Sequence, residues 1–151
     1  AAYNGAVAWG GANSPMRVSV GEDGYVYLCD WSDTNPGVWR MNPDKPAENF
    51  KPVFSGLSVS TGLASLNGVN VHGAISHCWV TGSGESTKLI TFDKYYTDAV
   101  ATNRGNLLQY HIGNLTSPRQ TPPDAILYND ALYGNLQQNY NSSIAPDGRG
   151  G

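Results

Sequence analysis

Residues 16–41 show the clearest alternation of apolar and polar positions in the chain. Apolar and polar side chains alternate over residues 16–20, which is the period of a pleated strand. A Gly-Glu-Asp-Gly segment follows, and an Asp-Gly pair between two such runs is typical of a hairpin because glycine accepts a positive φ. Apolar runs at residues 25–29 and 38–41 come next. The pattern predicts three antiparallel strands in a meander.

The middle run, residues 25–29, is apolar or aromatic at every position. A strand with two apolar faces must be covered on both sides. A polar turn containing a Pro-Gly pair leads to the third strand. Residues 50–56 supply a fourth, outermost strand, because Pro52 restricts a strand to a sheet edge. We therefore expect a four-stranded antiparallel unit over residues 16–56.

A second copy of this unit is predicted further along the chain. A glycine precedes a cysteine by five positions in both copies, Gly24 before Cys29 and Gly73 before Cys78. On this basis residues 69–80 align with the first hairpin and the strand after it. The alignment makes the run that holds Cys78 the second strand of its unit.

Further apolar runs complete the second unit, which we assign to residues 66–114. Residues 89–92 take the place of the third strand and residues 107–112 that of the fourth. Residues 115–141, rich in Pro, Asn, Gln and Tyr, are interpreted as an insertion or loop without convincing periodicity. Residues 142–151 resemble the opening of the first unit and are interpreted as the start of a further one.

The composition agrees with a turn-rich all-β chain. Of the 151 residues, 40% are hydrophobic and only 14% are charged, with 18 Gly and 9 Pro, a balance that fits β-structure better than helices. The formal net charge of -3 and the scattered arginines argue against a nucleic-acid partner. No apolar run approaches the roughly 20 residues of a membrane helix, so we expect no membrane span.

The chain has two cysteines, Cys29 and Cys78, and both lie in apolar runs. Two cysteines are too few for a disulfide framework in a chain of this length. Buried free thiols are the favoured interpretation. A single bridge between them is the alternative.

The repeat indicates a propeller. Self-similar four-stranded units at periods of roughly 40–50 residues are typical of that architecture, and Gly73 follows Gly24 by 49 residues. The first unit, with its Val-Gly-Glu-Asp-Gly-Tyr-Val-Tyr-Leu-Cys-Asp segment, resembles a blade of the NHL and SMP-30-like β-propellers. The second unit departs from the blade pattern, because His72 and Trp79 replace its two aspartates. The resemblance implies an all-β fold of four-stranded antiparallel meander blades.

Two blades and the start of a third do not close a ring, which needs about 4–8 blades. Each blade buries both faces against its neighbours, so an isolated pair would expose large apolar surfaces. We therefore expect an incomplete ring in this chain. The remaining blades would come from another chain, from further copies, or from a longer protein of which this chain is a fragment.

An oxygen-rich turn after the second strand is the candidate metal site. Asp30, Asp33 and Asn35 lie there, and Ca²⁺ binds several oxygens of this kind. The spacing is not that of an EF-hand, and an Asx turn explains the cluster as well. The resemblance adds that SMP-30-like lactonases hold a divalent ion with acidic and Asn side chains at the ring axis. Only Asp30 matches that pattern here.

Aromatic side chains form the candidate ligand site. Tyr95 and Tyr96 stand in a polar loop, where we expect them to be exposed. Trp31 and Trp79 are the other candidates, since aromatic faces stack on sugars and anchor peptides. The alternative for Trp31 is packing between blades.

These features favour a non-catalytic binding or scaffold module with a protein or carbohydrate ligand. The low charge, the abundance of Asn, Thr, Ser, Gly and Tyr and the blade type suggest an extracellular, periplasmic or cell-surface protein. One alternative is a metal-dependent lactonase- or esterase-like hydrolase of the SMP-30-like kind. Another is a structural subunit that assembles through exposed blade faces. No Gly-x-Ser-x-Gly elbow is present, and we assign no catalytic residue.

Overall fold

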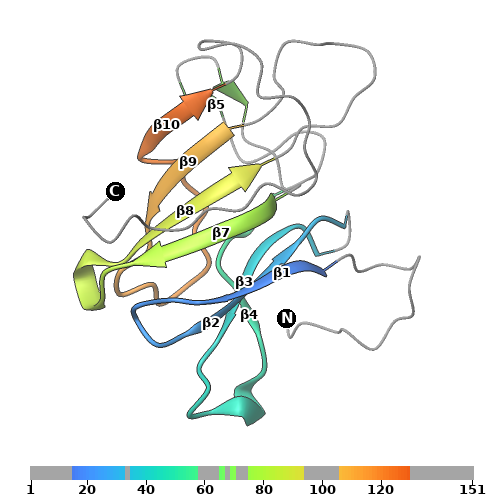
Figure 1. Cartoon of the computed structure of the whole chain (residues 1–151), viewed down its shortest axis with the longest axis vertical. Coiled ribbons are helices and arrows are strands. Elements are labelled where there is room, and N and C mark those ends of the chain that lie inside the picture. The colour runs from blue at the N-terminus through green and yellow to red at the C-terminus, as the bar shows by residue number, and fades with distance from the viewer. Residues whose placement is uncertain are drawn as a thin grey trace.

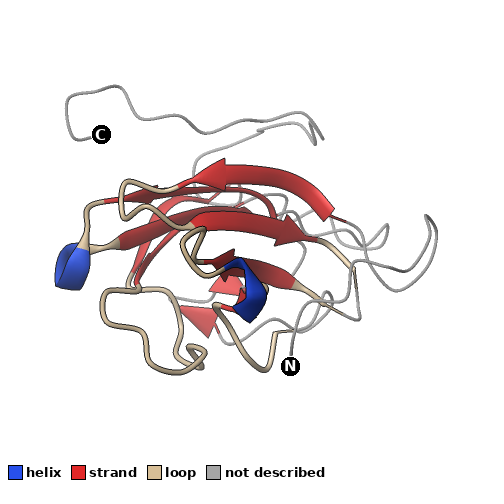
Figure 2. Cartoon of the chain, turned by 90° about the horizontal axis from the view of Figure 1, so that it is seen from below, coloured by secondary structure: helices blue, strands red, loops and turns tan. Residues whose placement is uncertain are grey.

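Regular structure in the computed structural model of the chain is almost entirely β-strand (Figure 2). The structure describes residues 15–32, 35–57, 65–66, 69–70, 75–93 and 106–129. The helical elements of these residues are the single 3₁₀ turns η1 (Pro46–Glu48) and η2 (Gly84–Ser86). Within the described ranges, no helix has the length and apolarity to cross a membrane. The predicted all-β class is confirmed.

The first sheet follows the sequence pattern. Its strands run in the order β1-β2-β3-β4, all antiparallel, and are β1 (Pro15–Val20), β2 (Val26–Asp30), β3 (Gly37–Met41) and β4 (Lys51–Pro52). The Asp-Gly hairpin joins β1 to β2, with Gly24 at a φ of 82°, a conformation that favours glycine. The strand that contains Pro52 lies at the sheet edge, as predicted.

The second sheet begins one strand later than the sequence alignment predicts. Its order is β10-β9-β8-β7, and its strands are β7 (Ile75–Thr81), β8 (Lys88–Asp93), β9 (Asn106–His111) and β10 (Ala125–Asn129). The strand with Cys78 is therefore the first of its sheet, whereas the strand with Cys29 is the second. Residues 69–70 belong to a separate two-stranded sheet of β5 (Ser65–Leu66) and β6 (Val69–Asn70).

The prediction was wrong here because a two-faced apolar pattern reports burial and not a strand's place within its sheet. β2 and β7 share the pattern since both strands are largely buried. The fourth strand, β10, lies inside residues 115–141, the range interpreted as a loop or insertion. Prolines just before this strand are typical of loops, so the sequence pattern did not indicate a strand there. The predicted start of a further blade, residues 142–151, lies outside the described residues.

The two sheets pack against each other with β1 and β2 next to β7 (Figure 1). Their shared core contains buried side chains from both sheets and from the segments that connect them: Tyr27, Cys29, Val38, Val53, Phe54, Ile75, Cys78, Val80, Leu89, Leu108, Tyr110 and Ile112. A core drawn from two sheets is what antiparallel sheets need, since each sheet must bury at least one apolar face. The described strands form these sheets without closing a ring.

The middle strand β2 is covered on both faces, as its sequence predicts. Tyr27 and Cys29 belong to the core between the sheets, and both are fully buried. Leu28 lies on the opposite face, where it forms a smaller cluster with Trp39 and Phe50. Val18 is paired with Leu28 in the sheet register and shares this outer face, but it is 63% exposed.

The β1–β2 hairpin is bonded directly to the second sheet. The Glu22 carboxylate accepts a hydrogen bond from the Gly82 amide at 2.7 Å and one from the Thr81 hydroxyl at 3.1 Å. A Cβ atom on Gly21 would lie 2.9 Å from Cβ of Val80, so this close approach requires glycine. The hairpin therefore fixes the position of one sheet on the other.

The core between the sheets should dominate stability. Leu108→Ala removes a fully buried side chain and should lower the free energy of unfolding by about 2–5 kcal/mol, from lost burial and the remaining cavity. Leu127→Ala, at a side chain 44% exposed on the same sheet, is the matched control and should change it by about 0.5 kcal/mol or less. Urea unfolding measures both. Equal losses in the two variants would contradict this arrangement of the sheets.

Candidate functional site

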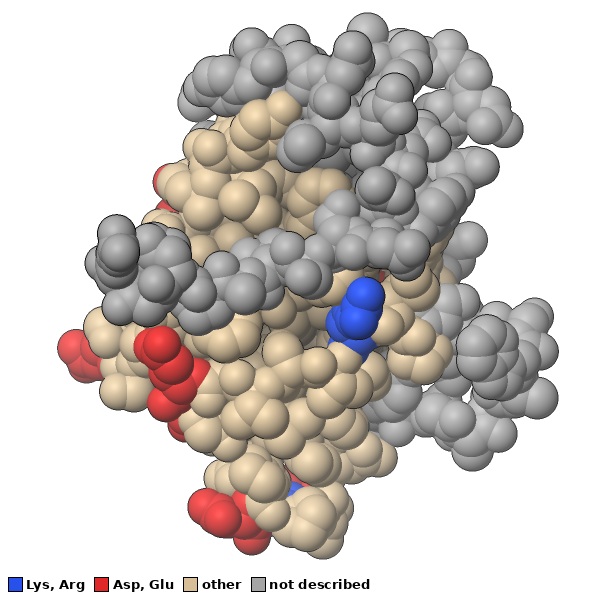
Figure 3. Space-filling model, viewed as in Figure 1, with Lys and Arg blue, Asp and Glu red and all other residues tan. Residues whose placement is uncertain are grey.

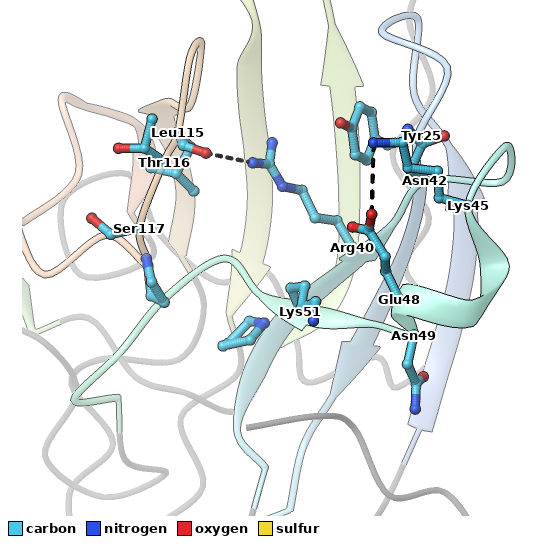
Figure 4. A pocket seen from close by; sticks show the side chains of 12 residues that line it. Tyr25, Arg40, Asn42, Lys45, Glu48, Asn49, Lys51, Leu115, Thr116 and Ser117 are labelled. Carbon is cyan, nitrogen blue, oxygen red and sulfur yellow. Dashed lines mark hydrogen bonds and ion pairs between the residues drawn. The ribbon is translucent and has the colours of Figure 1, made fainter.

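A groove of about 570 Å³ lies between the first sheet and the loop that follows β9. One side is formed by Tyr25, by Arg40 of β3 and by the segment from η1 to β4, which includes Lys51. The loop at residues 115–118 forms the other side. Figure 4 shows the Arg40 side chain extending from its strand across the groove toward the loop. The groove thus joins segments of the chain that are far apart in sequence.

Arg40 connects the two sides. Its Nη2 donates a hydrogen bond to the carbonyl oxygen of Leu115 at 2.8 Å. Its guanidinium carbon lies 5.0 Å from the centroid of the Tyr25 ring, within the range of a cation–π interaction. These contacts hold the guanidinium in one orientation at the groove.

The hairpin next to Tyr25 is itself ordered by Asp23. This carboxylate accepts a hydrogen bond from the Tyr25 amide at 3.2 Å and another from the Tyr27 hydroxyl at 2.6 Å. Burial, together with the bond to Asp23, raises the pKa of Tyr27 above its ordinary value, so the phenol remains a donor at all physiological pH values. The position of the Tyr25 ring follows from this rigid turn.

The groove carries an excess of positive charge. Arg40, Lys45 and Lys51 line it together with one carboxylate, that of Glu48. Lys45 and Glu48 form an ion pair at 3.6 Å, but both are largely exposed, so the pair adds little to stability. Lys51 is exposed, and no described residue pairs with its ammonium group. On the face of the molecule shown in Figure 3, few charged side chains are visible among the described residues.

The loop side of the groove is attached to the end of the first sheet through its backbone. Arg119 pairs with Phe54 in an isolated parallel bridge. The Arg119 amide donates to the carbonyl oxygen of Val53 at 2.8 Å, and the Ser55 amide donates to the Arg119 carbonyl oxygen at 3.0 Å. The groove therefore has a defined shape only when the two sheets are docked.

The Arg119 side chain also stabilises this loop, through hydrogen bonds to residues at and near its two ends. Its guanidinium donates to the carbonyl oxygens of His111 and Pro122, each at 2.6 Å, and to both carboxylate oxygens of Asp124 at 2.9 and 3.0 Å. Burial opposes ionisation of Asp124, but the hydrogen bonds and charge of Arg119, with the His111 amide, lower its pKa. A bidentate Arg–carboxylate pair of this kind is both strong and directional.

The oxygen-rich turn predicted as a metal site contains several short hydrogen bonds among its own residues. Oδ1 of the buried Asp30 accepts from the Ser32 amide at 2.7 Å and from the Ser32 hydroxyl at 2.6 Å. The Ser32 Oγ accepts from the Asn35 amide at 3.1 Å. Asp33 lies outside the described residues. Within the described ranges, no group of three or more His, Cys, Asp or Glu side chains could hold a metal ion.

Of the predicted aromatic ligand residues, the two that the structure describes do not lie at the groove. Trp31 directly follows β2 and Trp79 lies in β7; both are half-buried, and neither lines the groove. Nε1 of Trp79 and Nδ1 of the neighbouring His77 are buried without a hydrogen-bond partner in the described structure. Tyr95 and Tyr96 lie outside the described residues.

Sequence reasoning did not find the groove residues. Arg40 is one of several scattered arginines in the sequence, and its partner Leu115 is 75 positions away. The only related signal is the turn-rich composition of the segment before Lys51, which marks a loop but not a site.

Comparison with protein-family models, with curated proteins and with solved structures finds no match for this chain.

The Arg119–Asp124 pair predicts a pH-dependent stability. The folded pKa of Asp124 lies below its ordinary value of about 3.9, so the stabilisation is complete above that value and is lost as the pH falls through the folded pKa. Urea unfolding from about pH 6 to pH 2 should therefore show wild type more stable than Asp124→Asn near neutrality, with the difference shrinking in acid. Asp44→Asn, at an exposed loop position, controls for the loss of one negative charge. A difference between wild type and Asp124→Asn that grows in acid would contradict the assignment.

Proposed function

We propose that this chain is a portion of a β-propeller and acts as a non-catalytic binding module, with the groove as its ligand site. The observation that carries the proposal is the combination of side chains in the groove. Two cations, Arg40 and Lys51, face it beside the Tyr25 ring, and short polar side chains line the loop side. Such a surface suits a ligand with hydroxyl groups and negative charge.

The ligand class that fits best is a carbohydrate with carboxylate groups. The guanidinium of Arg40 has planar donors that match a carboxylate, and Lys51 adds an exposed point charge at the rim. Thr116 and Ser117 offer hydroxyl groups from the opposite side, and these can bond sugar hydroxyls. An acidic peptide has the same charge but presents fewer hydroxyl groups, so we place it second.

The arrangement of the sheets supports the propeller part of the proposal. Both four-stranded sheets are antiparallel meanders, and β1 and β7, each the first strand of its sheet, lie close together. Adjacent propeller blades have this relationship. The outer face of the first sheet also carries Val18 and Val20, each 63% exposed, which a further blade from another chain or copy would cover. A module of this composition is proposed to act outside the cytoplasm.

The binding proposal predicts a charge-dependent affinity. Isothermal titration should show that an oligosaccharide of galacturonic acid binds, and that the corresponding neutral galactose oligosaccharide binds at least about tenfold more weakly. Raising the salt concentration should weaken the acidic ligand's binding, because exposed charges are screened. A peptide rich in Glu, tested in parallel, identifies the second ligand class.

A matched pair of variants locates the site. Lys51→Gln removes a groove charge and should weaken binding by about threefold to tenfold. Lys88→Gln removes a charge of the same kind from β8, which does not line the groove, and should leave affinity unchanged. Equal binding of the neutral and acidic sugars, or equal effects of the two variants, would exclude the groove as an acidic-carbohydrate site.

A further inference from the structure

Cys29 and Cys78 meet at the centre of the core between the sheets. Cys29 lies on β2 and Cys78 on β7, and both are buried, with exposed fractions of 0% and 5%. Ser19 is paired with Tyr27 in the first sheet, and its hydroxyl lies 3.6 Å from Sγ of Cys78. Cys29 and Tyr27 both belong to the core that also contains Cys78. The two thiols therefore lie in the same core, on strands β2 and β7 that contact each other across the boundary of the sheets.

The two thiols lie close enough for each to affect the ionisation of the other. Contact with Cys78, together with burial, raises the pKa of the Cys29 thiol. The same contact, helped by the Ser19 hydroxyl, lowers the pKa of Cys78 against the effect of its own burial. A disulfide has a bond length of about 2.05 Å and forms between cysteines whose side chains are adjacent.

We propose that Cys29 and Cys78 form a disulfide that links the two sheets when the chain folds in an oxidising environment. The oxidant is a disulfide of low molecular weight, for which oxidised glutathione is the probe. The Cys78 thiolate attacks one glutathione sulfur and releases the other as a thiolate. The Cys29 thiolate then attacks the mixed disulfide at the Cys78 sulfur and releases the second glutathione. Two electrons pass to glutathione, and the two thiol protons go to solvent or to the released thiolates.

The bridge would restrict the unfolded chain strongly. It joins residues 49 positions apart in sequence, and a crosslink over a long loop removes more conformational entropy from the unfolded state than one over a short loop. Because both sulfurs are buried in the docked sheets, exchange with glutathione takes place before the sheets close or while they are transiently open. This inference does not depend on the ligand proposed for the groove.

The test is refolding of the full chain in buffers that span reduced to oxidised glutathione. In the oxidised buffers the intact mass should fall by about 2 Da, from loss of two hydrogen atoms. Peptide mapping should find residues 29 and 78 in one linked fragment, and Tm should rise by roughly 5–15 °C over the reduced protein. Dithiothreitol should reverse all three changes.

The reduced wild-type protein serves as its own control, so the result does not require any variant to fold. Cys29→Ser and Cys78→Ser should each abolish the mass decrease and the rise in Tm. Quantitative alkylation of both thiols after denaturation, even from the most oxidising buffer, would overturn the proposal. So would bridges formed only between two chains.

Discussion

The burial of β2 on both of its faces is the constraint on which the rest of the structure depends. An antiparallel sheet normally buries one face and leaves the other in water. Here the sequence of β2 is apolar on both sides, so each face must be covered. The second sheet covers the face with Tyr27 and Cys29, and Trp39 and Phe50 pack around Leu28 on the other. Packing of one sheet on the other is therefore required for either to fold.

The groove is a consequence of that packing. One side belongs to the first sheet and the other to the loop after β9. Arg40 and the backbone of Arg119 are the two connections between these sides. Separation of the sheets would break both connections and remove the groove. Binding of a ligand across it would accordingly stabilise the docked sheets by mass action, which links the proposed function to the stability of the fold.

The strands and their order could be predicted from the sequence for the first sheet but not for the second, and the reason is physical. In the first sheet, period-two alternation, an Asp-Gly turn and Pro52 are local signals, and each determines a local feature. In the second, the alignment relied on the spacing of Gly73 and Cys78, which says nothing about hydrogen-bonding partners. β10 has only five residues and follows a segment rich in proline. Its pairing with β9 is fixed by contacts that no local pattern records.

The same distinction applies to the candidate sites. Asp30 and Asn35 are suitable both for a cation and for an Asx turn, and composition alone cannot separate the two. In the structure the Ser32 amide and hydroxyl both donate to Asp30, which is the bonding of an Asx turn. Arg40 gave no signal, because its importance comes from Leu115, a residue distant in sequence.

The two cysteines show how a shared environment can be mistaken for a repeat. Cys29 and Cys78 have similar neighbours in the sequence, but they occupy different positions in their sheets. Their segments are alike because both strands enter the same core, where small and apolar side chains are required on each side. The strand with Cys29 is the second of its sheet and the strand with Cys78 is the first, so the units of this chain are better compared from β1 and β7 than from the cysteines.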